Sequence, residues 1–128
     1  MAQPLELILA RNLISTIALA AFLVDNEGTL VFFNTTAGSM IGRQFEQVGR
    51  LPAGDWVDDV GPFNELGELI PLDRLPMTQA LREGLPANGR FHARLKGDEL
   101  SEIEASGLPL VGRYGLQGAI IVFWEAAP

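Results

Sequence analysis

The residues with the most chemistry to offer lie on two stretches in which charged and apolar side chains alternate. His92 is the single histidine of the chain, and Arg90 and Arg94 flank it at a spacing of two. Glu102 and Glu104 follow with the same spacing. Residues two apart share one face of a β-strand, so a hairpin would lay the basic row beside the acidic row. We therefore interpret this stripe as a charge ladder, with His92 solvated or paired with Glu104.

Other candidates for catalysis or metal binding carry weaker patterns. The chain has no cysteine, which removes thiol nucleophiles, disulfides and thiolate metal sites. The one lysine, Lys96, has no phosphate-binding loop before it, and no serine lies in a nucleophile elbow. Asp55, Asp58 and Asp59 lack the spacing of a calcium loop, so we interpret them as a solvated helix face. Asp25 caps a turn in our interpretation; its alternative role is the buried base of a small α+β cone isomerase.

Length and composition limit the class of protein. The chain has 128 residues, which is the size of one domain, and 48% of them are hydrophobic, enough for a packed core. With 9 basic and 16 acidic residues the net charge is −7, which argues against nucleic acid and anionic membranes as partners. The apolar, uncharged stretch at residues 12–24 is shorter than the ~18–20 residues of a spanning helix. We therefore expect a cytoplasmic protein without a membrane segment.

The first third predicts a helix followed by a hairpin. Pro4 suits a first helical position, and apolar residues at helical spacing extend the helix over residues 4–14. An apolar run at 17–24, a turn at 25–28 and a strand at 29–33 follow. Asn34 is a suitable N-cap for a helix that Gly42 ends.

The remainder predicts short helices and then three strands. Proline and glycine break residues 43–73 into short helical pieces, and a longer helix over 72–83 ends at Gly84. Because Pro76 must lie in the first turn of that helix, its start is expected nearer Arg74. Strands at 90–96 and around 102–105 enclose a turn at 96–99. After a loop at 111–117, the strand at 118–124 is apolar on both faces, as is the run at 17–24.

These elements indicate an α+β domain with one antiparallel sheet. The two strands that are apolar on both faces belong at its centre. The middle helices can cover one face of the sheet. The other face needs a second cover, which is either the helix at 4–14 or a partner chain.

Three blocks of this sequence resemble the PAS family of sensory domains. They are residues 21–34 (AFLVDNEGTLVFFN) continuing to 40–43 (MIGR), residues 71–84 (PLDRLPMTQALREG), and residues 118–125 (GAIIVFWE). The resemblance covers residues 17–125. It implies a five-stranded antiparallel sheet of order 2-1-5-4-3, with helices between strands 2 and 3 on one face. Residues 1–16 would form a flanking dimerisation helix on the other face, and residues 126–128 a tail.

The resemblance also divides the apolar residues between the two faces of the sheet. The inner set would line a ligand cavity or would form an ordinary core. The small side chains of Ala37, Ala93 and Ala105 would leave space in such a cavity. The residues with polar groups that could contact a ligand there are Thr36, Ser39, Arg43 and Trp56. The inner set is Phe22, Val24, Phe33, Ala37, Met40, Ile41, Trp56, Leu75, Met77, Leu81, Phe91, Ile103, Ile121 and Phe123. The outer set would form a dimer interface and comprises Leu5, Ile8, Leu9, Leu13, Leu23, Ile120, Val122 and Trp124.

The function implied is that of a bacterial sensory and protein-interaction module without enzymatic activity. It would bind a small apolar ligand non-covalently, form a homodimer and act on a downstream signalling protein. Photosensory members attach flavin or coumaric acid to a cysteine, and haem-binding members use a histidine on the long helix. The chain has no cysteine and no histidine in residues 72–84, so we expect none of these cofactors. The alternatives are a ligand-free dimerisation scaffold and the cone isomerase.

Overall fold

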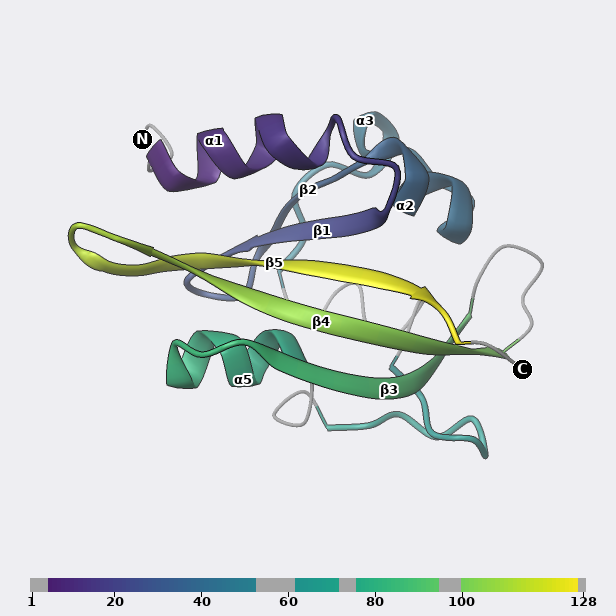
Figure 1. Ribbon diagram of the computed structural model, residues 1–128. Coiled ribbons are helices and arrows are strands. Elements are labelled where there is room, and N and C mark those ends of the chain that lie inside the picture. The colour runs from purple at the N-terminus through teal and green to yellow at the C-terminus, as the bar shows by residue number, and fades with distance from the viewer. Residues whose placement is uncertain (1–4, 53–61, 72–75, 95–99, 127–128) are drawn as a thin grey trace.

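A computed structural model describes residues 5–52, 62–71, 76–94 and 100–126, and shows a curved sheet with helices on both of its faces (Figure 1). The described elements are α1 (Leu5–Ile14), β1 (Ala20–Asp25), β2 (Leu30–Phe33), α2 (Thr35–Ile41), α3 (Phe45–Val48), α5 (Pro76–Glu83), β3 (Ala87–Arg94), β4 (Leu100–Gly112) and β5 (Gly115–Glu125). The five strands form one antiparallel sheet of order β2-β1-β5-β4-β3. The predicted fold class and strand order are therefore confirmed.

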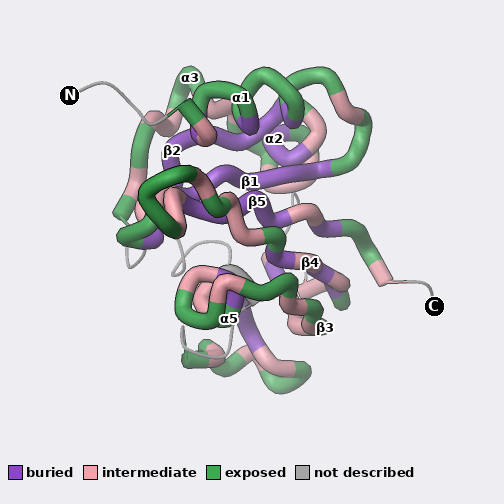
Figure 2. Tube along the Cα trace, turned by 60° about the vertical axis from the view of Figure 1, so that its left-hand side comes forward, coloured by how far each residue is buried: buried purple, intermediate pink, exposed green. Residues whose placement is uncertain are grey.

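The two strands that are apolar on both faces lie at the centre of the sheet. β1 pairs with β5 along its whole length, with Phe22 opposite Ile121 and Leu23 opposite Ile120. Alternate residues point to opposite faces, so each of the two strands contributes to two apolar layers. Figure 2 shows the buried stretches following β1 and β5, while the outer side of α1 is exposed.

The caps of α2 form as the sequence predicts. The Asn34 side chain accepts a hydrogen bond from the backbone N–H of Ala37, and Gly42 ends the helix in a left-handed conformation with φ 81°. A glycine adopts this conformation without the steric cost of a Cβ atom. Gly84 ends α5 in a similar way, with φ 65°. The described part of that helix begins at Pro76, and residues 72–75 lie outside the described residues.

The hairpin of β3 and β4 lays the basic row beside the acidic row, as predicted. Arg90 lies opposite Glu104, and apolar Phe91 faces the other side of the sheet. His92 lies opposite Glu102, so Glu104, its expected partner if it was paired, faces Arg90 instead. β3 begins at Ala87, three residues before the predicted start. The expected turn at 96–99 lies outside the described residues.

The loop predicted at 111–117 is wrong. β4 continues to Gly112 and β5 already begins at Gly115, so Arg113 and Tyr114 alone form a tight turn. The proline at 109 interrupts the strand pattern in the sequence, but it lies beyond Gly107, where the pairing with β3 ends. There β4 has only β5 as a neighbour, and a proline without an N–H is tolerated on an edge.

Helices cover the two faces of this sheet unequally. α1 packs on one face, which we call the outer face, against residues of β1, β2 and β5. α2, α3 and α5 pack on the opposite, inner face. Of the short helical pieces expected over residues 43–73, the structure describes α3; residues 53–61, with the three aspartates of the expected helix face, lie outside it.

Candidate functional site

An aromatic cluster forms the centre of the inner face. Phe22 contacts Phe33 with ring centroids 5.8 Å apart, and it contacts Phe123 with centroids 4.8 Å apart. Phe45 of α3 lies edge-on to Phe33, at 5.5 Å between centroids. The cluster thus joins three strands to the helical layer, because β1, β2 and β5 each contribute a ring.

Small side chains surround these rings. Ala93 of β3, Ala105 of β4 and Ala37 of α2 are buried in the same cluster, as predicted. Ala80 of α5 and Ala119 of β5 join them, both at 0% exposure. The inner layer therefore combines bulky aromatic rings with small side chains on the facing helices and strands.

The structure brings most of the predicted inner set together. Buried in one cluster are Phe22, Val24, Phe33, Ala37, Ile103, Ile121 and Phe123, and Met40, Ile41, Leu81 and Phe91 pack against it partly buried. Trp56 and Leu75 lie outside the described residues, as does the side chain of Met77 on α5. The proposed polar residues Ser39 and Arg43 are exposed, and Thr36 is half-buried, so Ser39 and Arg43 are corrected to surface positions.

Sequence reasoning missed part of the inner layer. Phe45, Val48 and Leu51 pack against the cluster, and Leu30 is buried within it. The backbones of Leu30 and Leu51 exchange two hydrogen bonds of 2.7 and 3.0 Å, which closes the loop after α3 against the edge strand β2. The spacing of Phe45 and Val48, three residues apart, is the sequence signal that could have identified this helical face.

The outer face carries a second apolar layer beneath α1. Leu7, Ala10 and Ile14 of α1 are buried against Leu23 and Ile120 of the central strands. Leu23 and Ile120 are covered by α1, so they support the helix and do not lie on the open surface.

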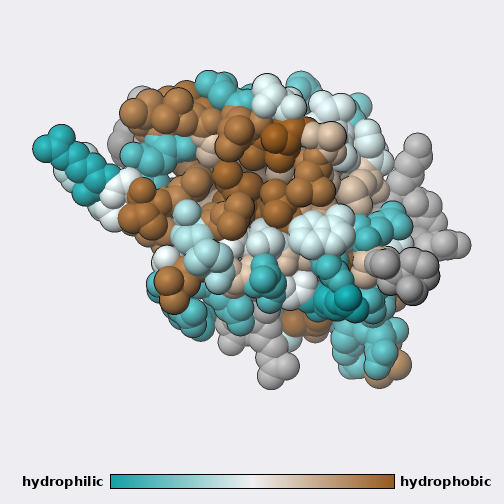
Figure 3. Space-filling view, in the orientation of Figure 1, coloured by the Kyte–Doolittle hydropathy of each residue, from teal (hydrophilic) through white to brown (hydrophobic). Residues whose placement is uncertain are grey.

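The remaining residues of the predicted outer set lie on the open surface. On α1, Leu5, Ile8, Leu9 and Leu13 are exposed, with Leu9 at 57%. Val122 is half-buried and Trp124 is 37% exposed on the same face of the sheet. Figure 3 shows hydrophobic side chains gathered over α1 and the part of the sheet next to it. This exposed set, Leu5, Ile8, Leu9, Leu13, Val122 and Trp124, is called the outer patch below.

Contacts at three points hold α1 on the sheet. The guanidinium of Arg11 lies over the ring of Phe32, 4.4 Å from its centroid, and 5.6 Å from that of Phe45. Near the other end of α1, the Glu6 carboxylate lies where a Cβ of Gly112 would be. A Cβ at Gly118 would likewise collide with the buried Leu7 side chain of α1. The flanking helix is therefore an integral layer of the domain.

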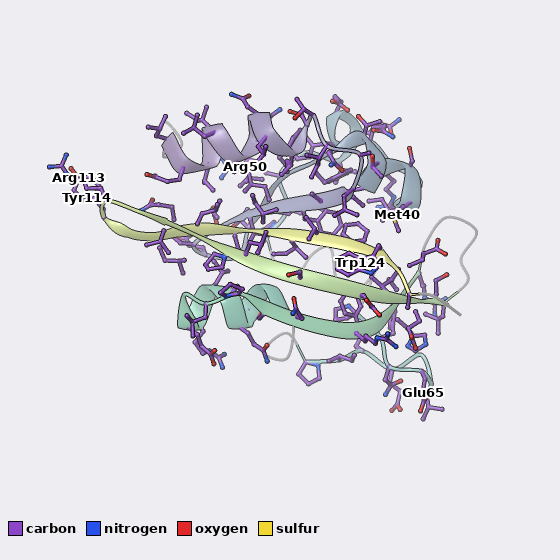
Figure 4. All side chains as sticks on the ribbon, in the orientation of Figure 1. Met40, Arg50, Glu65, Arg113, Tyr114 and Trp124 are labelled. Atoms are coloured by element: carbon purple, nitrogen blue, oxygen red, sulfur yellow. The ribbon has the colours of Figure 1, made fainter. Side chains whose placement is uncertain are left out.

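A groove of about 390 Å³ lies beside the outer patch. Arg90, Glu104 and Trp124 form one row across β3, β4 and β5, and Asn88 and Ser106 form the next row. Glu104 accepts hydrogen bonds from Arg90 and from the indole nitrogen of Trp124. Figure 4 shows Trp124 over the sheet, at the opposite end from Arg113 and Tyr114 at the hairpin tip.

Comparisons with known proteins identify the fold. The sequence matches no protein-family model and no curated protein. Among solved structures, a PAS domain from Colwellia psychrerythraea superposes with a TM-score of 0.65 at 18% identity, covering 93% of this chain and 97% of that one. The chain has the PAS fold. A PAS domain from a two-component sensor histidine kinase (TM-score 0.61, 16% identity, 95% and 97% covered) is also similar.

A further similar structure is the LOV protein of Rhodobacter sphaeroides, with a TM-score of 0.71 at 17% identity. The match covers 95% of this chain and 68% of that protein.

Asp25 stabilises the turn between β1 and β2. Its Oδ1 accepts hydrogen bonds from the N–H groups of Glu27 (2.9 Å) and Thr29 (3.0 Å), and its Oδ2 lies 3.7 Å from Arg50. These contacts are those of a turn cap, which is the interpretation made from the sequence.

The described part of the chain has neither a membrane-spanning helix nor a cluster of metal ligands. None of its helices has the length and apolarity needed to cross a membrane. Across the same residues, no three side chains of His, Cys, Asp or Glu gather where a metal ion could bind.

Proposed function

We propose that this chain is a bacterial sensory and protein-interaction module that works in the cytoplasm. In this proposal it binds a small apolar ligand non-covalently between the sheet and its inner helices. It signals by changing how two copies pack against each other through the outer patch, and a downstream signalling protein responds. The fold it shares with PAS domains of sensor proteins supports this class of function.

The inner layer supports the ligand part of the proposal. Apolar and aromatic side chains dominate small-molecule sites, with few polar groups among them. Phe22, Phe33 and Phe123 provide aromatic faces, and Ala37 and Ala105 are small enough to leave room beside them. Such a site would select an apolar or amphipathic molecule by shape.

The proposed protein interaction rests on one observation: α1 is apolar on both sides. One side, with Leu7 and Ile14, is buried on the sheet, while Leu9 and Leu13 on the other side are more than half exposed. Contiguous apolar surface of this kind marks an interaction site in soluble proteins. A second copy is the partner we propose, because the patch continues from α1 onto the sheet through Val122 and ends in the charge-balanced row at Trp124.

The mechanism is a shift between two populated arrangements. A ligand can bias a protein toward one conformation only by binding it more tightly than the other. Here the ligand would favour one position of α2 and α5, and that position would determine how α1 and the outer patch are presented.

Charge substitution in the outer patch tests the interface. We expect the wild-type chain to have the mass of a dimer by multi-angle light scattering, and Leu9→Glu to have that of a monomer. Leu66→Glu is the matched control, because Leu66 is 79% exposed but lies in the turn beside Glu65, away from α1 (Figure 4). A folded Leu9→Glu protein that stays dimeric would refute the proposed interface.

A further inference from the structure

Asn34 uses its whole side-chain amide in hydrogen bonds to four residues in three segments of the chain. It is a buried polar residue, with 2% exposure. Its Oδ1 accepts from the N–H groups of Ala21 (3.2 Å) and Ala37 (3.0 Å). Its Nδ2 donates to the carbonyl oxygens of Ile14 (2.9 Å) and Leu19 (2.8 Å). An amide has two donors and an acceptor oxygen with two lone pairs, so its capacity is filled.

The two halves of this amide serve opposite faces of the sheet. The acceptor half caps the first turn of α2, whose Ala37 is fully buried in the inner layer. The donor half holds the carbonyl of Ile14, the last residue of α1, and of Leu19, just before β1. The outer helix and the inner helix are thus joined through one planar group.

The other carbonyls in the last turn of α1 are satisfied locally. The carbonyl of Arg11 accepts from Ser15, that of Asn12 from the Ser15 hydroxyl, and that of Leu13 from Thr16. Ile14 is different, because its carbonyl is bound by a side chain twenty residues away. A helix end that is buried needs such a partner for its free carbonyls.

Neither helix is expected to persist without its packing. α1 has 10 residues and α2 has 7, whereas isolated helices below roughly 12–15 residues are marginal in water. The hydrogen bonds at their ends therefore matter to both. If the first turn of α2 moves, the amide moves with it, and the donor that holds the end of α1 is withdrawn.

We propose that Asn34 couples the inner helical layer to α1, so that displacement of α2 releases the end of α1 and the reverse holds too. Asn34 is a positioning residue in this scheme. The coupling deepens the proposed function, and its role in signalling rests on that function, because α2 borders the proposed ligand site and α1 carries the outer patch. The physical coupling itself requires neither ligand nor dimer.

Asn34→Asp removes the donor half of the amide and keeps the acceptor half. The carboxylate keeps an acceptor oxygen for Ala37, but it replaces the donor with a second acceptor facing the carbonyls of Ile14 and Leu19. We expect backbone hydrogen exchange in α1 to become about 30-fold faster, as for the loss of two hydrogen bonds. Asn26→Asp adds the same charge in an exposed turn and is the matched control, with unchanged exchange in α1.

Leu7→Ala tests the coupling in the opposite direction and leaves Asn34 intact. The substitution removes a side chain with which α1 packs on the sheet, so the helix is held less tightly. We therefore expect the N–H of Ala37 in α2 to exchange roughly tenfold faster, as when one capping hydrogen bond is lost. This measurement also serves if the Asn34→Asp protein does not fold.

Unchanged exchange at Ala37 in a Leu7→Ala protein whose α1 has opened would overturn the proposal, as would unchanged exchange in α1 of a folded Asn34→Asp protein. Both readouts are made without ligand and compare the variants with wild type at one protein concentration, so neither requires a dimer. A failure of dimerisation or of ligand binding would therefore contradict the proposed function and leave the coupling intact.

Discussion

The indole nitrogen of Trp124 donates a 3.0 Å hydrogen bond to Oε2 of Glu104 on the neighbouring strand. The other oxygen of that carboxylate accepts from Arg90, one strand further along. One carboxylate thus fixes an aromatic ring and a guanidinium in a row across three strands of the outer face. The row forms the polar end of the outer patch, where the apolar surface of α1 and β5 gives way to the charge ladder.

Glu104→Ala should cost more stability than Glu102→Ala. Glu104 holds both Arg90 and Trp124, while Glu102 is bonded to Arg90 at 3.2 Å. Because Arg90 is largely exposed, the ion pairs are screened, and we expect a loss of about 1 kcal/mol or less for Glu104→Ala. Chemical denaturation of both variants measures the difference. An equal or larger loss for Glu102→Ala would show that the bond to Trp124 contributes nothing.

Gly118→Ala should destabilise the domain by about 1–3 kcal/mol, the usual range for overpacking. A Cβ at this position would collide with the backbone carbonyl oxygen of Val24 and with the Leu7 side chain. Gly112→Ala is the matched control, since its Cβ would meet the end of the flexible Glu6 side chain, which can move aside. Thermal denaturation of both variants tests the pair. Equal melting temperatures for the two would contradict the packing described here.

Arg11→Ala should weaken the packing of α1 against the edge strand β2. The guanidinium lies 4.4 Å from the centroid of Phe32, and a cation–π contact at an exposed site contributes about 0.5–1 kcal/mol. Arg113→Ala removes a similar contact, with Tyr114 at the hairpin tip, but that ring is 86% exposed. We expect the Arg113 variant to unfold at the wild-type denaturant concentration and the Arg11 variant at a lower one. Coincident transitions for all three proteins would argue against this anchor.

The parts of the fold that two independent patterns specify could be predicted from the sequence. The β3–β4 hairpin is one, because the alternation of Arg90 and His92 and that of Glu102 and Glu104 agree on one hairpin with the charged rows side by side. The centre of the sheet is another, since β1 and β5 are apolar on both faces. The cap at Asn34 could be predicted as a local feature.

Long-range contacts account for what the sequence did not reveal. The continuation of β4 past Pro109 depends on where β3 stops pairing, which no local pattern contains. The sequence does not show which side of α1 packs on the sheet, because the helix is apolar nearly all round. Leu7 and Leu9 have the same side chain, and only the folded structure buries one of them and exposes the other. The bonds from Asn34 to Ile14 and Leu19 likewise appear only once the chain has folded back on itself.

In the proposed function, binding of an apolar ligand inside the domain changes how a second copy packs against it. Native mass spectrometry of the purified chain, followed by denaturation of the same sample, tests both parts together. We expect a dimer that releases an apolar molecule of defined mass when the protein is denatured. A dimer without a released molecule would favour the ligand-free scaffold, and a monomer with no bound mass would contradict the proposed function.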